Sequence, residues 1–308
     1  MSASDHEFGI IDVVRRAAGH DARVPLGIGD DAAALQLTVG ARCLVTTDLL
    51  LEGVHFETPA ATPEQVGRKA LAVNLSDIAA MAGKPVAAFV SVAFARDRGR
   101  EFAERVMRGL QSLADEFDVA IAGGDTNVWP GPTMISVTIV GESSAGPPVT
   151  RAGARAGDWI MVTGCFGNSP AGHHLSFRPR VKEALQLREL ADLHSMIDVS
   201  DGLAADLHHI LDESDSGAIV EVSEVPIRET DVAGDDDQSP LDHALSDGED
   251  FELLFTVSEQ DGRRLPDMIC DGVPVQRIGE IVGDDRRELV YPDGSVTDLP
   301  RTGWEHRF

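Results

Sequence analysis

Short apolar runs and longer segments with helical spacing alternate through the first half of the chain. The run from Arg42 to Thr47 is short, rich in β-branched residues and bounded by turn residues, which predicts a buried strand. Residues 62–83 place small and apolar side chains at helical spacing behind a Thr-Pro start, and therefore predict a helix. By the same two periods we expect strands over 85–95, 119–122 and 133–141, and helices over 7–18 and 100–117. This alternation is typical of an α/β or α+β domain.

The second half repeats this kind of pattern after a turn-rich stretch, residues 142–148, that resembles a linker. We expect strands over 158–162, 195–199 and 251–257, and a helix over 203–212. A chain of 308 residues is too long for one typical hydrophobic core. We therefore predict two domains, residues 1–148 and 149–308.

Aspartates recur where predicted strands end or predicted helices begin. Asp48 follows the strand that starts at Arg42, Asp125 follows two glycines, and Asp198 and Asp201 precede a helix. A carboxylate at the end of a buried strand is costly unless a cation meets it, and hard metal ions prefer oxygen ligands. A single aspartate in such a place is more often a turn residue. The prediction of a metal site therefore depends on the recurrence.

Two other polar features leave alternatives open. Asn74 and Asp77 lie three residues apart and share one face of an apolar helix. They are either a satisfied polar pair near a kink or cap, or part of a site. The histidine pairs His173-His174 and His208-His209 cannot share one helix face, and we interpret them as surface residues rather than ligands.

Charge and composition narrow the class of function. The formal charge of −26 disfavours nonspecific binding to nucleic acid or to an anionic membrane, because no cationic field is available. Most of the acidic excess is expected to face water, and adaptation of the host to salt is one possible origin. Only Lys69, Lys84 and Lys182 accompany the arginines, so a polyanionic substrate would need metal ions for positive charge.

The cellular location follows from cysteines and apolar segments. The three cysteines are far apart and lack CxxC spacing, which disfavours a disulfide framework or a zinc site and predicts a reducing cytoplasm. The N-terminus lacks the basic flank and apolar core of a signal peptide. Asp77 and Lys84 interrupt the most apolar region, which therefore does not predict a membrane span.

Several familiar catalytic signatures are absent from the sequence. It contains no Walker lysine loop, no HRD or DFG kinase set, no GxSxG elbow and no HExxH zinc motif. Separated aspartates with Ser or Thr neighbours, in a chain poor in lysine, best fit a phosphate site that holds several Mg²⁺ ions.

The motifs GIGDDAA, KALAVNLSDIAAMAGKP, GGDT, SMIDVSDGL, GEDFELLF and the terminal GWEHRF resemble the thiamine-monophosphate kinase family. That family is related to aminoimidazole-ribonucleotide synthetase and selenophosphate synthetase. The resemblance runs nearly end to end. It implies an α/β (α+β) synthetase-like fold, with an N-terminal sheet domain that dimerises by sheet pairing and binds ATP and Mg²⁺, and a C-terminal α/β domain.

The resemblance also implies an activity: ATP-dependent phosphorylation of thiamine monophosphate to thiamine diphosphate, by a cytoplasmic homodimer that requires several Mg²⁺ ions. The acceptor phosphate has a second pKa of about 6, so in-line phosphoryl transfer would need no dedicated general base. The alternatives are another ATP-dependent synthetase of the same superfamily, and a catalytically weakened protein that binds nucleotide or thiamine phosphate.

Site residues follow from the matching positions. The resemblance implies Mg²⁺ ligands at Asp31, Thr46, Thr47, Asp48, Asp77, Asp125, Asp198 and Asp201, with Asp30 as a weaker candidate. It implies nucleotide contacts at Gly124, Asp125, Arg151 and Ser200, and thiamine monophosphate contacts at His55, Glu249 and Trp304. Asp48, Asp77, Asp125 and Arg151 are expected to act in catalysis.

Three departures from the family pattern concern the second half. Asp247 stands in place of the first glycine of the usual GGED, and Asn168 stands where the Gly-rich turn commonly has Asp. The segment 172–181 is shorter than usual. We expect a trimmed second domain and an altered turn around Glu249.

Overall fold

The computed structural model describes residues 21–143, 145–229, 238–265 and 272–304. The helix expected over 7–18 lies outside these residues. The chain divides into two compact units: residues 1–78 with 83–147, and residues 79–82 with 148–308. In the part of the chain that the structure describes, no helix combines the length and apolar character needed to cross a membrane.

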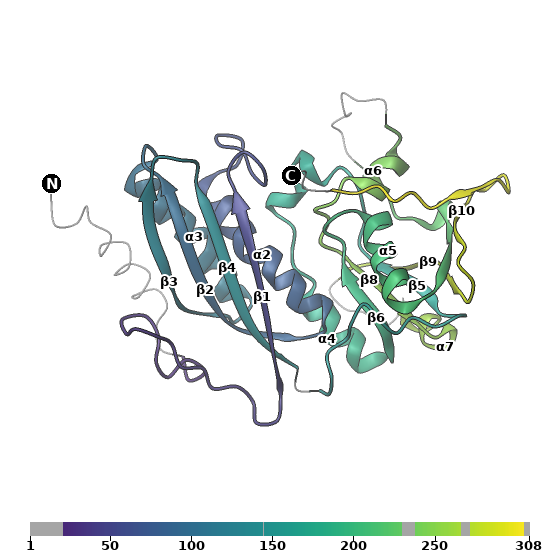
Figure 1. Ribbon diagram of the computed structural model, residues 1–308, viewed down its shortest axis with the longest axis horizontal. Helices are drawn as coiled ribbons and strands as arrows, with labels where there is room; N and C mark the ends of the chain where they lie inside the picture. The colour runs from purple at the N-terminus through teal and green to yellow at the C-terminus, as the bar shows by residue number, and fades with distance from the viewer. Residues whose placement is uncertain (1–20, 144, 230–237, 266–271, 305–308) are drawn as a thin grey trace. The chain divides into compact units, whose positions relative to one another are not determined.

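The N-terminal unit is a four-stranded sheet with two helices on one face (Figure 1). Its elements are β1 (Arg42–Leu51), α2 (Pro63–Ala80), β2 (Lys84–Ala95), α3 (Gly99–Glu116), β3 (Ala120–Trp129) and β4 (Met134–Ser143). The strand order is β1-β4-β2-β3. β2 and β3 are parallel, whereas β4 pairs with β1 and β2 in antiparallel register.

Helix α2 starts as its sequence predicts. Thr62 Oγ1 accepts a hydrogen bond from Gln65 N (3.3 Å), and Gln65 Oε1 accepts one from Thr62 N (2.9 Å). This reciprocal capping satisfies two backbone donors at the helix start. The helix then buries Val66, Ala70 and Leu75 completely, which fixes the face that Asn74 and Asp77 share.

Strand β1 differs from the expected buried strand. It continues to Leu51 because its pairing with β4 runs from Arg42 opposite Ser143 to Leu51 opposite Met134. As an edge strand it is covered on one face only, and Val45 and Leu49 stay 65% and 50% exposed. Asp48 therefore lies inside a strand rather than at its end.

Asp125 also lies inside a strand rather than at its end. Its strand, β3, continues to Trp129 beside β2. The expectation that Asp48 and Asp125 terminate strands was wrong, because each strand stays paired with its neighbour beyond the apolar run from which it was predicted.

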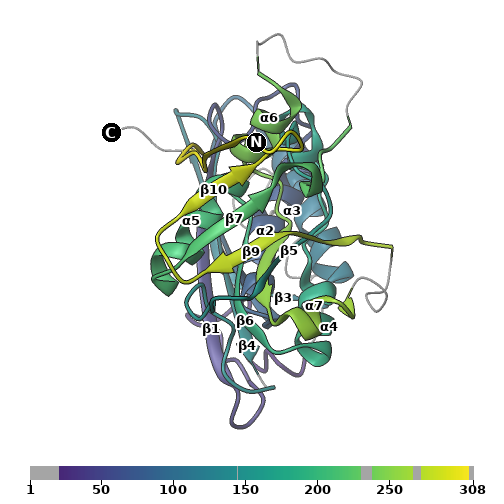
Figure 2. The same ribbon diagram turned by 90° about the vertical axis from the view of Figure 1, so that its right-hand side faces the viewer.

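The C-terminal unit is built on a seven-stranded sheet. Its strands are β5 (Trp159–Thr163), β6 (Leu193–Asp198), β7 (Gly217–Glu221), β8 (Leu253–Val257), β9 (Val275–Val282), β10 (Arg287–Val290) and β11 (Val296–Asp298). Their order is β11-β10-β7-β9-β5-β8-β6, and Figure 2 shows β10, β7, β9 and β5 side by side. The accompanying helices are α4 (Val181–Leu190), α5 (Leu203–Ser214), α6 (Pro240–Ser246) and α7 (Glu259–Gly262).

One core of this unit lies between the sheet and α5. Leu203, Leu207 and Ile210 of α5 pack with Ile197 of β6 and Leu254 of β8, all almost fully buried. This packing sets the direction of the β6–α5 turn, which follows Asp198 at the end of β6. Here the expected strand end, turn and helix start are all found.

Candidate active site

A carboxylate pair, Asp48 and Asp77, lies between β1 and α2. Thr46 Oγ1 donates a hydrogen bond to Asp77 Oδ2 (2.5 Å), and Asp48 N donates one to Asn74 Oδ1 (3.1 Å). Thr46 and Asp48 share the helix-facing side of β1, because alternate strand residues point to the same face. Asn74 and Asp77 meet them from α2, so both helix residues belong to this cluster.

The pKa of Asp48 reflects its buried position beside a second carboxylate. Burial and, after it, the neighbouring Asp77 carboxylate together raise the pKa of Asp48 to about 7. Two carboxylates and a threonine hydroxyl are hard oxygen donors of the kind that Mg²⁺ binds. This donor set therefore fits a divalent cation, whose charge would favour the ionised form of Asp48.

Other predicted ligands of this unit lie apart from the pair. Thr47 faces the opposite side of β1, where its Oγ1 accepts a hydrogen bond from Thr138 Oγ1 (2.9 Å). Asp125 is exposed on β3, the other edge of the sheet, where it accepts a hydrogen bond from Asn127 Nδ2 (2.7 Å). Within one chain, the N-terminal unit does not bring Thr47 or Asp125 to Asp48.

The turn residues and Gly124 complete the predicted set in this unit. Asp30 and Asp31 are exposed in a turn, where Asp30 Oδ1 accepts a hydrogen bond from Asp31 N (3.0 Å). At Gly124, φ is +152°, and an added Cβ would lie 1.8 Å from Val90 O. Glycine is therefore needed at this position because β3 approaches β2 too closely for a side chain, whether or not a ligand binds.

The loop after β1 fixes the ring of His55. His55 Nδ1 accepts a hydrogen bond from Leu51 N (3.0 Å), which places the proton of the neutral imidazole on Nε2. Lys69, only 1% exposed, donates a hydrogen bond from Nζ to His55 O (2.6 Å). Lys69 was not predicted as a site residue, although a lone lysine within an apolar helix was a usable signal.

In the C-terminal unit, the β6–α5 turn carries the predicted acidic residues. Asp198 is 5% exposed at the end of β6. Asp206 Oδ2 accepts hydrogen bonds from Ser200 N and Asp201 N, each 3.0 Å long. Burial and, after it, the Asp201 carboxylate raise the pKa of Asp206 to about 7, although the backbone hydrogen bonds and the charge of Arg151 act against the rise. Arg151 therefore lies within electrostatic reach of this turn.

Asp206 was missed by the sequence reasoning. Oxygen atoms of Asp201 and Asp206 and a ring nitrogen of His209 lie within 4.8 Å of one another and could hold a metal ion. Asp206 lies in the first turn of α5, where an acidic residue is commonly explained by its favourable interaction with the helix dipole. The run Asp-Val-Ser-Asp-Gly, residues 198–202 directly before that helix, was the signal that could have found it.

The two C-terminal substrate candidates flank the same turn. Glu249 N donates a hydrogen bond to Ser200 O (2.7 Å), and Trp304 N donates one to Asp201 O (2.9 Å). The Trp304 side chain is 53% exposed, so core packing does not explain it. The structure thus brings Ser200, Asp201, Glu249 and Trp304 together within the C-terminal unit.

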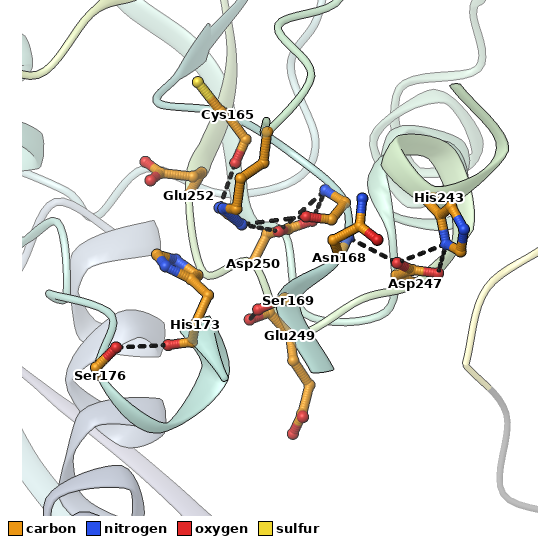
Figure 3. A network of polar contacts seen from close by, with 12 residues as sticks. Cys165, Asn168, Ser169, His173, Ser176, His243, Asp247, Glu249, Asp250 and Glu252 are labelled. Atoms are coloured by element: carbon orange, nitrogen blue, oxygen red, sulfur yellow. Dashed lines mark hydrogen bonds and ion pairs between the residues drawn. The ribbon is translucent and has the colours of Figure 1, made fainter. Parts of the chain in front are cut away.

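The interpretation of the histidine pairs as surface residues was wrong for three of the four, His173, His174 and His208; His209 is exposed. His208 is 5% exposed, and its Nε2 lies 3.3 Å from Leu299 O. The His174 side chain is 13% exposed, and its Nδ1 lies 3.1 Å from Glu249 Oε2. Sequence adjacency hid this, because neighbouring residues of a helix point in different directions: α5 buries His208 and leaves His209 exposed. Figure 3 shows this turn beside Asp247, Glu249 and Asp250.

Comparison with known proteins agrees with this architecture. Residues 29–143 match the N-terminal domain, and residues 150–292 the C-terminal domain, of the AIR synthase related proteins. These matches confirm the predicted α/β fold class.

Relatives that cover nearly the whole chain are named thiamine-monophosphate kinase. One from Rhodopirellula baltica is 39% identical over 89% of this chain and 92% of its own length. The crystal structure of thiamine-monophosphate kinase from Stenotrophomonas maltophilia is 33% identical, with a TM-score of 0.80 over 96% of this chain and 98% of that one. AaThiL complexed with AMPPCP and TMP is 27% identical, with a TM-score of 0.73 over 100% and 99%. The chain belongs to the thiamine-monophosphate kinase family.

Proposed function

We propose that this protein transfers the γ-phosphoryl group of ATP to the phosphate of thiamine monophosphate, giving thiamine diphosphate and ADP. The relatives that cover the chain carry the corresponding name, and one similar structure holds AMPPCP and TMP. The observation in this chain that carries the proposal is the buried carboxylate of Asp48 beside that of Asp77.

The metal sites are part of the proposal. In the N-terminal unit Thr46, Asp48 and Asp77 would hold Mg²⁺, and in the C-terminal unit Asp198 and Asp201 would do so. Bound Mg²⁺ supplies the positive charge that two phosphate groups need in order to approach each other.

The remaining residues bind and orient the reactants. Arg151 adds a fixed positive charge for the transferring group. His55 presents an Nε2 proton as a hydrogen-bond donor for a phosphate oxygen, since Leu51 N occupies Nδ1. Glu249 accepts a hydrogen bond from the aminopyrimidine, and the exposed ring of Trp304 stacks on the cationic heteroaromatic ring.

No side chain needs to act as general base. The second pKa of a phosphate monoester is about 6, so the attacking oxygen is already anionic at neutral pH. The chemical problem is repulsion between two anions, which cations held by the carboxylates, together with arginine, would relieve.

The proposal extends to a homodimer built on the open face of the N-terminal sheet. Both α2 and α3 cover the other face (Figure 1), and Val45 and Leu49 leave apolar surface exposed on the open side of an edge strand. Burial of such surface favours association.

The direct test is incubation of the purified protein with ATP, MgCl₂ and thiamine monophosphate, with chromatographic detection of products. Thiamine diphosphate and ADP should form in equal amounts and only with Mg²⁺ present. Binding of both ligands without product would favour the catalytically weakened alternative. ADP release stimulated by a different acceptor, such as a ribonucleotide amidine precursor, would favour another synthetase of the superfamily.

A further inference from the structure

The turn that carries Glu249 is tied to the Gly-rich turn by a series of hydrogen bonds (Figure 3). Asp247 Oδ2 accepts one from Asn168 N (2.7 Å), and Glu249 O accepts one from Ser169 Oγ (2.5 Å). Asp250 accepts another from Gly167 N, at 3.1 and 3.2 Å to its two oxygens. Three of the four residues from Asp247 to Asp250 are thus connected to one neighbouring segment.

The backbone of this turn needs such support. Glu249 and Phe251 have φ angles of +55° and +53°, although neither is a glycine. Left-handed backbone is unfavourable for an L-residue because its Cβ crowds the following carbonyl oxygen, so the surrounding contacts must hold it. The conformation directs the Glu249 side chain away from Asp247 and Asp250 (Figure 3).

Asp247 is anchored on a second side. Both of its carboxylate oxygens lie 3.0 Å from His243 Nδ1, one turn earlier on α6. The His243 and Asp247 side chains are 12% and 16% exposed. Asp247 therefore connects α6 to Asn168 and stands directly before the left-handed residues.

His174 acts on the other end of Glu249. Its Nδ1 lies 3.1 Å from Glu249 Oε2, and the histidine is the more buried partner. The short 3₁₀ helix His173–Leu175 that presents it is held against the same turn, because Phe177 stacks on Phe251 with ring centroids 4.2 Å apart. The ring of His174 thus meets the Glu249 carboxylate from a segment with its own anchor.

We propose that His174 and Asp247 are positioning residues for the thiamine end of the substrate: His174 orients the Glu249 carboxylate, and Asp247 holds the backbone that presents it. The inference rests on the proposed function, and in particular on Glu249 as acceptor for an aminopyrimidine. It also gives a function to Asp247, which replaces the glycine usual in the family, because its carboxylate binds Asn168 N and His243 and a glycine has no side chain to do so.

The test is a double-mutant cycle read by calorimetric binding of thiamine monophosphate in the presence of Mg²⁺. His174→Ala should weaken binding about tenfold while the KM for ATP changes less than about twofold, because only one substrate contacts Glu249. His174→Gln, which retains a donor, should recover part of the loss. In a Glu249→Ala background, His174→Ala should change the affinity less than about twofold, because the carboxylate that it orients is gone.

Asp247→Ala is tested in the same cycle and should behave in the same way. Two control variants separate positioning from general stability. His194→Gln removes another histidine–carboxylate pair of this unit, 2.7 Å between His194 Nδ1 and Asp158. Asp242→Ala removes the carboxylate half of the capping box that Asp242 forms with Ser239 at the other end of α6. Both should lower the thermal midpoint and leave the affinity for thiamine monophosphate unchanged.

Two results would overturn the inference while the proposed function stands: unchanged affinity in His174→Ala, or an equal loss with and without Glu249 in an enzyme whose wild type is active. A wild-type protein that neither binds nor phosphorylates thiamine monophosphate would reject the proposed function, and the inference with it.

Discussion

At the scale of single residues, the pKa of Asp48 links the stability of the fold to pH. Its pKa rises from 3.8 to about 7, first because the side chain is buried and second because Asp77 lies beside it. A carboxyl group whose pKa is raised in the folded state stabilises the fold fully below its unfolded pKa. That contribution is lost as the pH rises through the folded pKa, so the window runs from 3.8 to about 7.

Asp48→Asn should remove this dependence. In EDTA, the thermal midpoint of the wild type should fall relative to that of the variant between about pH 4 and about pH 8, because only the wild type acquires an uncompensated charge. At about pH 8, Mg²⁺ should raise the midpoint of the wild type more than that of the variant. Turnover in the variant should fall by a factor of about 100 or more.

Asp97→Asn is the matched control, because Asp97 is an exposed aspartate of the same unit. It should resemble the wild type in all three measurements. An Asp48→Asn variant with full activity and an unchanged response to Mg²⁺ would show that the metal site lies elsewhere.

At the scale of elements, the crossing of α2 and α3 holds the N-terminal site in place. A Cβ added at Gly67 would lie 1.9 Å from Val106 O, and one added at Gly109 would lie 2.0 Å from Glu64 O. Both contacts involve helix backbone, which cannot move away cheaply. The two helices thus approach closely at two glycines, and α2 carries Asn74 and Asp77 toward β1.

Gly109→Ala should therefore destabilise the protein. In an ordinary helix this substitution gains about 1 kcal/mol, but here the methyl group must separate two helices, and overpacking costs about 1–3 kcal/mol or more. The net effect should be a lower free energy of unfolding in urea. Ser112→Ala, at an exposed position of α3, should be neutral or slightly stabilising. Stabilisation by Gly109→Ala would contradict the close approach.

At the scale of the whole molecule, the large net negative charge affects the stability of the fold. The chain carries 52 acidic and 26 basic side chains, a formal charge of −26. Ion pairs such as Arg105–Glu64 and Arg286–Asp284 neutralise only part of the acidic excess. The remaining like charges repel one another and oppose the compact state.

Salt should consequently stabilise the protein. Raising NaCl from about 0.05 M to about 0.5 M shortens the Debye length from roughly 14 Å to about 4 Å, which screens this repulsion. The thermal midpoint should rise in differential scanning calorimetry at neutral pH. A midpoint that falls with NaCl would mean that attractive pairs outweigh the net repulsion.

The proposed dimer gives a second prediction at this scale. Placing lysine at both Val45 and Leu49 should convert a species of twice 32.9 kDa into one of 32.9 kDa in light scattering. Exposed lysines on an edge strand oppose pairing of sheets between copies. Val296→Lys, at another exposed apolar position, is the control and should leave the mass unchanged. A wild-type protein that is already monomeric would reject the dimer.

The sequence by itself determined the kind of element at most positions and the acid-rich β6–α5 turn. Helical and strand periods depend on neighbours a few residues away, so they can be read locally. The capped start of α2 and the strand that ends at Asp198 are examples. The family also followed from sequence, through motifs whose spacing is local.

Only the tertiary structure decided which side chains meet. Asp48 and Asp125 look alike in sequence, yet one faces Asp77 and the other lies on the far edge of the sheet. His174 meets Glu249, which comes from a distant segment of the chain. Strand order and strand face arise from pairing between distant segments, which no local pattern encodes. Those pairings decide which aspartates lie together and which lie apart.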